Sequence, residues 1–339
     1  MKVLLIALLL ATQQPDDVLQ RIDAATRLVD SGKVDEAITA LKAIVAAHPD
    51  NATAKYELAL AYSAKGDPEH CRQILEPMAD TADALGMLGN CYDDLGQRDK
   101  AVATYQRGLK LAPTDSQLTY NLAVTLAQTG KLDEARELLK TDTRANPWHA
   151  SGHLLLAKIF EAQNFRVPAA FSYLHFLALE PSPRANDAAA HLQALLNLGF
   201  EKTKEGANIT IDTNARTEEG DYGPMQMAFA LAAASSTLEK NAKLSDFEKA
   251  STQVALTIAL FIEQAGGHDD YTGVVQRPFF ASMEKAKLVD TFAAIAVTPL
   301  RLKGTDEWVK SHGKDLARYS EWIAPQMRRP GVTTSKPSS

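Results

Sequence analysis

A repeat of about 34 residues constrains the fold of this 339-residue chain more than any other sequence feature. Glycines lie near the middle of four successive units, at Gly32, Gly66, Gly96 and Gly130. Prolines lie at the ends of four units, at Pro49, Pro113, Pro147 and Pro181. Repeats of this length are typical of solenoids, in which each unit buries its apolar face only against its neighbours. The first half of the chain is therefore predicted to be an extended array.

Each unit has the pattern of two helices joined by a tight turn. Apolar residues recur three and four positions apart, which marks one face of a helix. The glycine ends the first helix. A small residue such as Ala37, Ala101 or Ala135 then lets the second helix approach the first closely. The proline stops the second helix, and the next unit begins.

These residues resemble the tetratricopeptide repeat, and the resemblance covers five units from about Val18 to Pro183. The most complete unit carries Leu85, Leu88, Gly89, Tyr92, Gly96, Ala101, Tyr105, Gly108 and Pro113. Two positions depart from the pattern, because Cys71 replaces an alanine and Asn164 replaces a glycine. The resemblance implies an all-α fold, an α-solenoid of about five helix-turn-helix repeats.

The repeat pattern also suggests the domain boundaries. Residues Arg184 to Glu201 are predicted to form a helix that covers the last repeat, so the repeat domain spans 15–201. Residues 202–325 are predicted to form a small helical domain, with one short strand at Asn208 to Thr213. The tail 326–339 is rich in basic residues, proline and serine, and is predicted to be disordered.

Apolar stripes at helical spacing predict three or four helices in the second domain. Proline in a first turn and a Ser-x-x-Glu capping box mark two of the helix starts. The segments are Pro224 to Leu238, the stretch behind Ser245 and Glu248, Phe280 to Val297, and a last helix beginning at Thr305.

The first residues have the composition of a secretory leader. One positive charge at Lys2 precedes the apolar run Val3 to Ala11, which is too short to span a bilayer. The alternative is a hydrophobic staple at the start of the first helix. Residues 1–14 are predicted to be a signal peptide, which would place the mature protein in a periplasm or outside the cell. No other stretch is long and apolar enough for a membrane span.

In tetratricopeptide repeats the first helix of each pair lines a concave surface that binds peptides or protein segments. The resemblance therefore implies a groove lined by Tyr56, Leu60, Asn90, Asp93, Asp94, Tyr120, Asn121, Val124, Gln128 and Lys158. Family members often hold a ligand backbone at the positions of Asn90 and Asn121, and an amide both donates and accepts. Lysines of the carboxylate-clamp type are missing, since Gly86 and Tyr120 occupy their positions.

Each of these groove residues also has a purely structural interpretation. Asparagine is common at the positions of Asn90 and Asn121 even without a ligand. Asp93 and Asp94 fit a solvated helix end, and groove tyrosines often serve packing. The sequence leaves both interpretations open.

The two cysteines, Cys71 and Cys91, fall on helices of adjacent repeats that are expected to pack together. An oxidising compartment would allow a disulfide, provided that the Cα atoms come within about 7 Å. The favoured interpretation is a pair of small buried residues, with a disulfide as the alternative.

The sequence contains only fragments of possible catalytic sites. The loop Gly266 to Arg277 gathers His268, Asp269 and Asp270, which suit either a metal or acid–base site or an ordinary solvated turn. Metalloprotease, serine-hydrolase, phosphate-binding and dinucleotide motifs are absent from the sequence. No cofactor, metal site or catalytic residue is predicted.

The charge balance limits the class of partner. The chain has 36 basic and 42 acidic residues, and neither half carries a basic stripe that would attract nucleic acid. Most of the negative charge lies in the repeat half, so a strongly acidic partner is disfavoured.

The leading hypothesis is an exported, non-catalytic adaptor or scaffold that binds a protein or peptide. The alternatives are a hydrolase-like enzyme with its site in the second domain, and a structural component of a cell-envelope assembly. The oligomeric state is left open.

Overall fold

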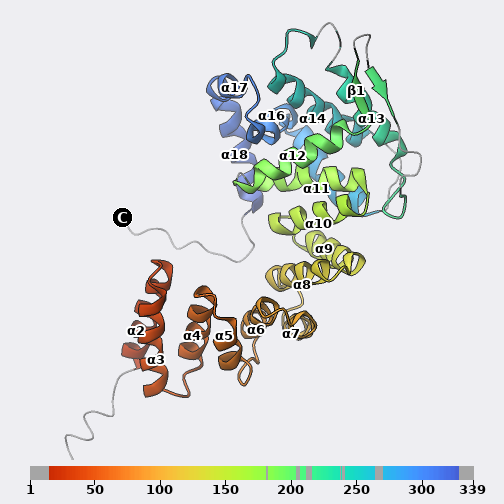
Figure 1. Ribbon diagram of the computed structural model, residues 1–339. Coiled ribbons are helices and arrows are strands. Elements are labelled where there is room, and N and C mark those ends of the chain that lie inside the picture. Colours follow the sequence, from red (N-terminus) through yellow and green to blue (C-terminus); the bar gives the residue numbers. More distant parts are fainter. Residues whose placement is uncertain are drawn as a thin grey trace, which may run out of the picture. The chain divides into compact units, whose positions relative to one another are not determined.

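The computed structural model describes residues 15–180, 182–203, 207–210, 216–236, 238, 241–263 and 270–327 (Figure 1). The chain separates into two compact units, Met1–Lys131 and Leu132–Ser339. The predicted leader, residues 1–14, lies outside the described residues. Within the described part, no helix has both the length and the apolar character needed to cross a membrane.

The first unit consists of paired helices in chain order. They are α2 (Pro15–Asp30), α3 (Val34–Ala47), α4 (Ala52–Ala64), α5 (Pro68–Leu75), α6 (Ala82–Asp94), α7 (Arg98–Leu111) and α8 (Ser116–Gln128). Helices within a pair pack on each other, as α4 does on α5 and α6 on α7. The first helices of successive pairs also lie side by side, since α2 contacts α4, α4 contacts α6 and α6 contacts α8. This second set of contacts lines α4, α6 and α8 up along one wall.

The turn inside each pair has one repeated geometry, which explains the glycine spacing. At Gly96 the backbone is left-handed, with φ 70°. The Gly96 amide donates to Asp93 O over 2.8 Å, and the Gln97 amide donates to Tyr92 O over 2.8 Å. These bonds satisfy carbonyls that the end of the helix leaves unpaired. Asn164 adopts the same conformation, with φ 63°, because asparagine tolerates this region better than most residues.

Small residues allow the two helices of a pair to approach each other, as the sequence predicted. Ala37, Ala101 and Cys71 occupy equivalent positions on the second helices, and each has no exposed surface. Gly89 plays this role on a first helix, because a methyl group there would overlap the ring of Tyr105. The close approach of α6 and α7 therefore depends on glycine at this position.

The second unit is also helical, apart from a two-stranded hairpin. Its helices are α9 (Leu132–Ala145), α10 (Ala150–Ala162), α11 (Arg166–Leu179), α12 (Arg184–Asn197), α13 (Gly223–Ser235), α14 (Asp246–Glu263), α15 (Arg277–Lys285), α16 (Val289–Val297), α17 (Thr305–Ser311) and α18 (Gly313–Met327). A π-helix, η2 (Thr272–Gln276), and a 3₁₀-helix, η3 (Thr298–Leu300), flank α15 and α16. Strand β1 (Phe200–Lys202) pairs antiparallel with β2 (Ala207–Ile209), and Phe200 lies opposite Ile209.

Helix α11 forms the centre of this unit. Every residue from Arg166 to Leu179 is buried, because α10, α12, α13, α16 and α18 all contact the helix. Arg166 is buried as well, and its guanidinium donates to Leu195 O over 2.9 Å and to Leu198 O over 2.8 Å. These bonds satisfy carbonyls at the end of α12.

The boundary between the compact units differs from the boundary predicted at residue 201. The last helices of the repeat pattern, α10 and α11, belong to the same unit as the helices that follow them. The physical reason is the apolar character of α11, whose surface needs cover on every side.

Several predicted segments end at other residues than expected. The covering helix stops at Asn197 rather than Glu201, because Gly199 turns the chain with φ 78° into β1. The stretch Phe280 to Val297 contains two helices, which separate where Lys287 adopts φ 56°. The last helix is likewise divided into α17 and α18.

The predicted strand and the predicted tail are also revised. The strand covers Ala207–Ile209, whereas residues 211–215 lie outside the described part. Helix α18 runs through Pro325 to Met327, so residues 326 and 327 are helical rather than part of a disordered tail. The remaining tail, 328–339, lies outside the described residues.

The predicted start of α14 is confirmed. The Ser245 hydroxyl accepts from the Glu248 amide over 3.2 Å, and the Ser245 amide donates to Glu248 Oε2 over 2.7 Å. This reciprocal pair is a capping box, which satisfies two amides that the first turn leaves unpaired.

Candidate groove of the first unit

Three hollows lie along α4, α6 and α8, with volumes of about 350, 180 and 370 Å³. Tyr56 and Asp83 line both the first and the second hollow. Asn90 and Asn121 line both the second and the third. Because neighbouring hollows share these side chains, they form one continuous groove across the three helices.

A network of amides occupies the centre of this groove. Asn121 Nδ2 donates to Asn90 Oδ1 over 2.9 Å, and Gln117 Nε2 donates to Asn121 Oδ1 over 2.9 Å. Tyr105 donates its hydroxyl proton to the same Asn90 Oδ1 over 2.7 Å. The Asn90 carbonyl therefore accepts two protein hydrogen bonds. Among the described residues, no acceptor pairs with Asn90 Nδ2, and Asn90 is only half buried. That amino group is available to a ligand carbonyl.

Tyr105 positions Asn90 from the neighbouring helix α7. The Tyr105 side chain comes from α7 and is 2% exposed, and its ring occupies the space that Gly89 leaves open. Burial raises the pKa of the Tyr105 hydroxyl, and the nearby Asp93 and Asp94 raise it further. The hydroxyl therefore keeps its proton and remains a donor to Asn90.

The groove is acidic at both ends. Asp80 and Asp83 line the first hollow, and Asp93 and Asp94 line the third. Burial raises the pKa of Asp94, and the charge of Asp93 adds to this shift. Asp115 lines the second hollow, where it caps α8 by accepting from the Gln117 amide over 2.8 Å and the Leu118 amide over 2.9 Å.

The structure brings most of the predicted groove residues together. The predicted residues that line the three hollows are Tyr56, Asn90, Asp93, Asp94, Tyr120, Asn121 and Val124. Leu60 is half buried on α4 and lines none of these hollows. Gln128 lies at the end of α8, where its Oε1 accepts from Arg98 Nε over 3.2 Å. Lys158 is exposed on α10 and belongs to the second unit.

Several groove residues are not evident from the sequence alone. Tyr105 was identified only as part of the repeat pattern, although Gly89 is the signal that a large side chain covers α6. Asp80, Asp83 and Asp115 were not singled out, although they lie at or near the starts of α6 and α8, where acidic residues are favoured.

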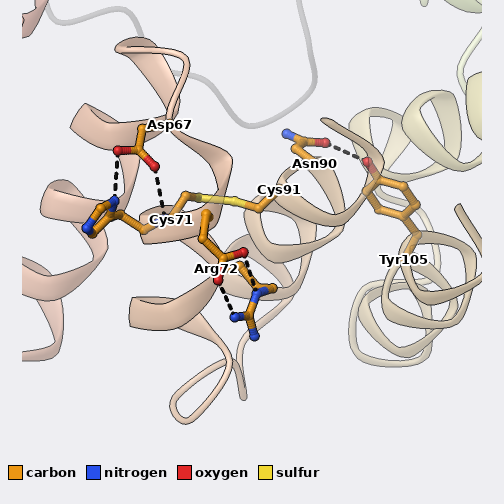
Figure 2. The surroundings of a disulfide bond; sticks show 8 residues. Asp67, Cys71, Arg72, Asn90, Cys91 and Tyr105 are labelled. Carbon is orange, nitrogen blue, oxygen red and sulfur yellow. Dashed lines mark hydrogen bonds and ion pairs between the residues drawn. A yellow bond between two sulfur atoms is a disulfide. The ribbon is translucent and has the colours of Figure 1, made fainter. Parts of the chain in front are cut away.

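A disulfide lies directly behind the groove wall. It joins Cys71 on α5 to Cys91 on α6, with Cα atoms 6.2 Å apart, and both residues are fully buried. The favoured prediction of two unlinked small residues therefore does not hold, and the alternative does. Figure 2 shows the disulfide next to Asn90, which directly precedes the bonded Cys91 in α6 and points toward Tyr105. The bond ties the backbone that carries Asn90 to the preceding repeat.

The loop that sequence analysis considered for catalysis is only partly described. Gly266 to Asp269, including His268, lie outside the described residues. Asp270 accepts from the Tyr222 hydroxyl over 2.5 Å and from the Gly273 amide over 3.0 Å. Both bonds hold the start of η2, which is a structural role. The described residues contain no cluster of three or more histidine, cysteine or acidic side chains suited to a metal ion.

Comparison with known proteins supports the interpretation of the repeat. The family model for the tetratricopeptide repeat matches residues 28–84 and 94–159. The chain contains tetratricopeptide repeats. Human aspartyl/asparaginyl beta-hydroxylase is 24% identical over 168 residues, which are 45% of this chain and 22% of that protein. The TPR repeat-containing thioredoxin TTL4 of Arabidopsis thaliana is 30% identical over 105 residues, 30% of this chain and 15% of that protein. The chain thus spans less than a quarter of either relative.

Solved structures with tetratricopeptide repeats are also similar. The Pseudomonas aeruginosa protein pilF is 20% identical, covers 53% of this chain and 85% of its own, and has a TM-score of 0.47. YrrB, a TPR protein with an unusual peptide-binding site, is 21% identical, covers 50% of this chain and 90% of its own, and has a TM-score of 0.40.

Proposed function

We propose that this protein is an exported, non-catalytic adaptor that holds a protein or peptide segment in the groove of α4, α6 and α8. Tetratricopeptide repeats favour a role in protein–protein interaction. The observation that carries the proposal is the network centred on Asn90, whose carbonyl is fixed by Tyr105 and Asn121 while its amino group is left for a ligand.

The network suits an extended main chain. A peptide presents carbonyls and amides along its length, and a fixed side-chain amide pairs with them without regard to sequence. Because Tyr105 and Asn121 already hold Asn90 in place, little side-chain entropy is lost when a ligand binds. The tyrosines Tyr56 and Tyr120 line the same groove and provide contact area on either side of the amides.

Two features support export. The apolar run Val3 to Ala11 has the length of a leader rather than a membrane span. The Cys71–Cys91 disulfide is of the kind that persists in oxidising compartments and is rare in the cytosol of mesophiles. A fusion of residues 1–30 to a reporter enzyme that is active only after export tests this part, and an inactive reporter would contradict it.

The adaptor role can be tested with a displayed library of random 12-residue peptides, selected on the immobilised full chain. The strongest peptides are then synthesised with a fluorescent label and titrated by fluorescence anisotropy. Replacing both groove amides, in an Asn90→Ala and Asn121→Ala double variant, is expected to weaken binding at least about tenfold, as for the loss of one or two hydrogen bonds to a ligand.

Gln106→Ala serves as the matched control, because Gln106 is an exposed amide on α7, outside the residues lining the three hollows. It should bind like the unmodified protein. Circular dichroism melts of all variants establish that each is folded. The proposal fails if no peptide is enriched, or if the folded double variant binds the selected peptides as tightly as the control.

A further inference from the structure

The groove carries charge of one sign only, which is negative. Among the described residues that line the three hollows, none is a lysine, an arginine or a histidine. The charged lining residues are all aspartates: Asp80, Asp83, Asp93, Asp94 and Asp115. The chain as a whole carries 36 basic side chains against 42 acidic ones, so their absence from the groove is local rather than a consequence of composition.

These carboxylates differ in how far the protein already uses them. Asp115 caps α8, and Asp93 accepts from the Thr125 hydroxyl over 3.3 Å and lies 4.0 Å from Arg98. Asp80, Asp83 and Asp94 are exposed. The three exposed carboxylates therefore keep most of their capacity to accept hydrogen bonds from a ligand.

The neighbouring groups respond to the negative charge of these aspartates. The pKa of Asp94 is raised, first by the partial burial of its carboxyl group and then by the charge of Asp93. The pKa of Tyr56 is also raised, first by burial and then by Asp83 and Glu57. A cation in the groove would relieve this repulsion at both ends.

Resting on the proposed function, we propose that the occupant of the groove is an extended peptide segment that carries lysine or arginine side chains. Asn90 and Asn121 hold its main chain, while Asp83 at one end and Asp94 at the other receive its cationic side chains. Tyr56 and Tyr120 line the same hollows as these carboxylates, and aromatic rings attract lysine and arginine. Neutral and acidic peptides lack this complementarity and are excluded or bind weakly.

The experiment uses the full chain and the same displayed library of random 12-residue peptides. Lysine and arginine should be enriched among the selected sequences, and aspartate and glutamate depleted. The labelled peptides are then titrated against a triple variant, Asp83→Asn, Asp93→Asn and Asp94→Asn, which keeps the side-chain shapes and removes three charges. Affinity should fall about four- to 25-fold, since Asp83 and Asp94 each lose one exposed ion pair and such a pair contributes roughly two- to fivefold. Raising the salt concentration from 50 to 500 mM should weaken peptide binding by the unmodified protein far more than peptide binding by the variant.

Asp99→Asn is the matched control, because Asp99 is an exposed aspartate on α7, outside the lining of the three hollows, and its loss should leave affinity within about twofold. Peptides that need Asn90 and Asn121 but show no basic bias, or that bind the folded triple variant unchanged, would overturn this inference and leave the adaptor role standing. A selection that enriches no peptide would overturn both.

Discussion

Two buried histidines in the second unit should make its stability depend on pH. His153 on α10 and His175 on α11 have no exposed surface, and their rings stack with centroids 3.9 Å apart. Phe279 stacks on His175 as well, with centroids 4.0 Å apart. His153 Nε2 donates to Pro147 O over 2.9 Å, and His175 Nδ1 donates to Gln276 Oε1 over 2.5 Å. In the described part of the protein, the other nitrogen of each ring has no partner.

This environment favours the neutral form of both rings. Burial lowers the pKa of His175 to about 4, although the hydrogen bond to Gln276 acts in the opposite direction. Burial also lowers the pKa of His153 well below its usual range, and the charge of His175 and that of His149 contribute further. A proton on either free nitrogen would place a charge inside an aromatic stack, and no carboxylate among the described residues pairs with either ring.

The magnitude follows from proton linkage. The unfolded chain protonates His175 near pH 6.5, whereas the folded protein does so only near pH 4. The folded protein therefore has its full stability above about pH 6.5, where His175 is neutral in both states. The contribution of His175 to that stability is lost as the pH falls toward 4. At about 1.4 kcal/mol per pH unit, His175 alone removes roughly 2 kcal/mol of unfolding free energy between pH 7 and pH 5.

Urea unfolding followed by tryptophan fluorescence measures the unfolding free energy of the second unit, which contains both histidines. The three tryptophans, Trp148, Trp308 and Trp322, all belong to the second unit. The unfolding free energy is compared at pH 7 and pH 5 for the unmodified protein and for His175→Phe, which keeps an aromatic ring in the stack.

The variant carries a constant cost from the unpaired Gln276 carbonyl, but this cost is the same at both pH values. Its loss of stability between pH 7 and pH 5 should be smaller than that of the unmodified protein by about 2 kcal/mol. His191→Gln, which replaces a histidine with a 48% exposed side chain, should retain most of the original pH dependence. Equal losses in His175→Phe and the unmodified protein would refute the assignment.

Three further predictions concern local features of the fold. Asn164→Gly removes the side chain from a left-handed turn position, so thermal unfolding should show a gain of a few tenths to about 1 kcal/mol, and a loss would count against the turn geometry. Ser245→Ala removes half of the capping box with Glu248 and should cost about 1 kcal/mol in urea unfolding, in contrast to Ser245→Thr, which keeps the hydroxyl. Reducing the Cys71–Cys91 disulfide should lower the stability of the first unit by about 3 kcal/mol, as expected for a loop of 20 residues, when unfolding is followed by circular dichroism. A double Cys→Ala variant should not respond to the reductant, and two alkylatable thiols in the native protein would contradict the bond.

Much of the first unit was predictable because its signals are local. The turns need a residue with a left-handed backbone at one position of each repeat, and the regularly spaced glycines indicate that position in the sequence. Close helix contacts need small side chains, which Ala37 and Ala101 reveal by their spacing. The predicted groove amides, Asn90 and Asn121, do line the hollows, because their place in a repeated helix fixes the direction in which they point.

The contributions of α7 and of the acidic residues were not predictable in the same way. Tyr105 reaches Asn90 only because the missing side chain of Gly89 opens a path between two helices, and this depends on how the helices pack. The acidic character of the groove likewise follows from which side chains three separate helices bring to one surface.

The repeat, its helix pairs, its turns and the position of the amides can all be read from the sequence, since each of these depends on spacing along one or two helices. Tertiary structure alone decided the Cys71–Cys91 bond, the Tyr105–Asn90 contact and the buried His153–His175 stack. It also decided that the last repeat helices belong to the second unit. The physical reason is that burial and the distance between helices are properties of packing, which no spacing along a single helix specifies.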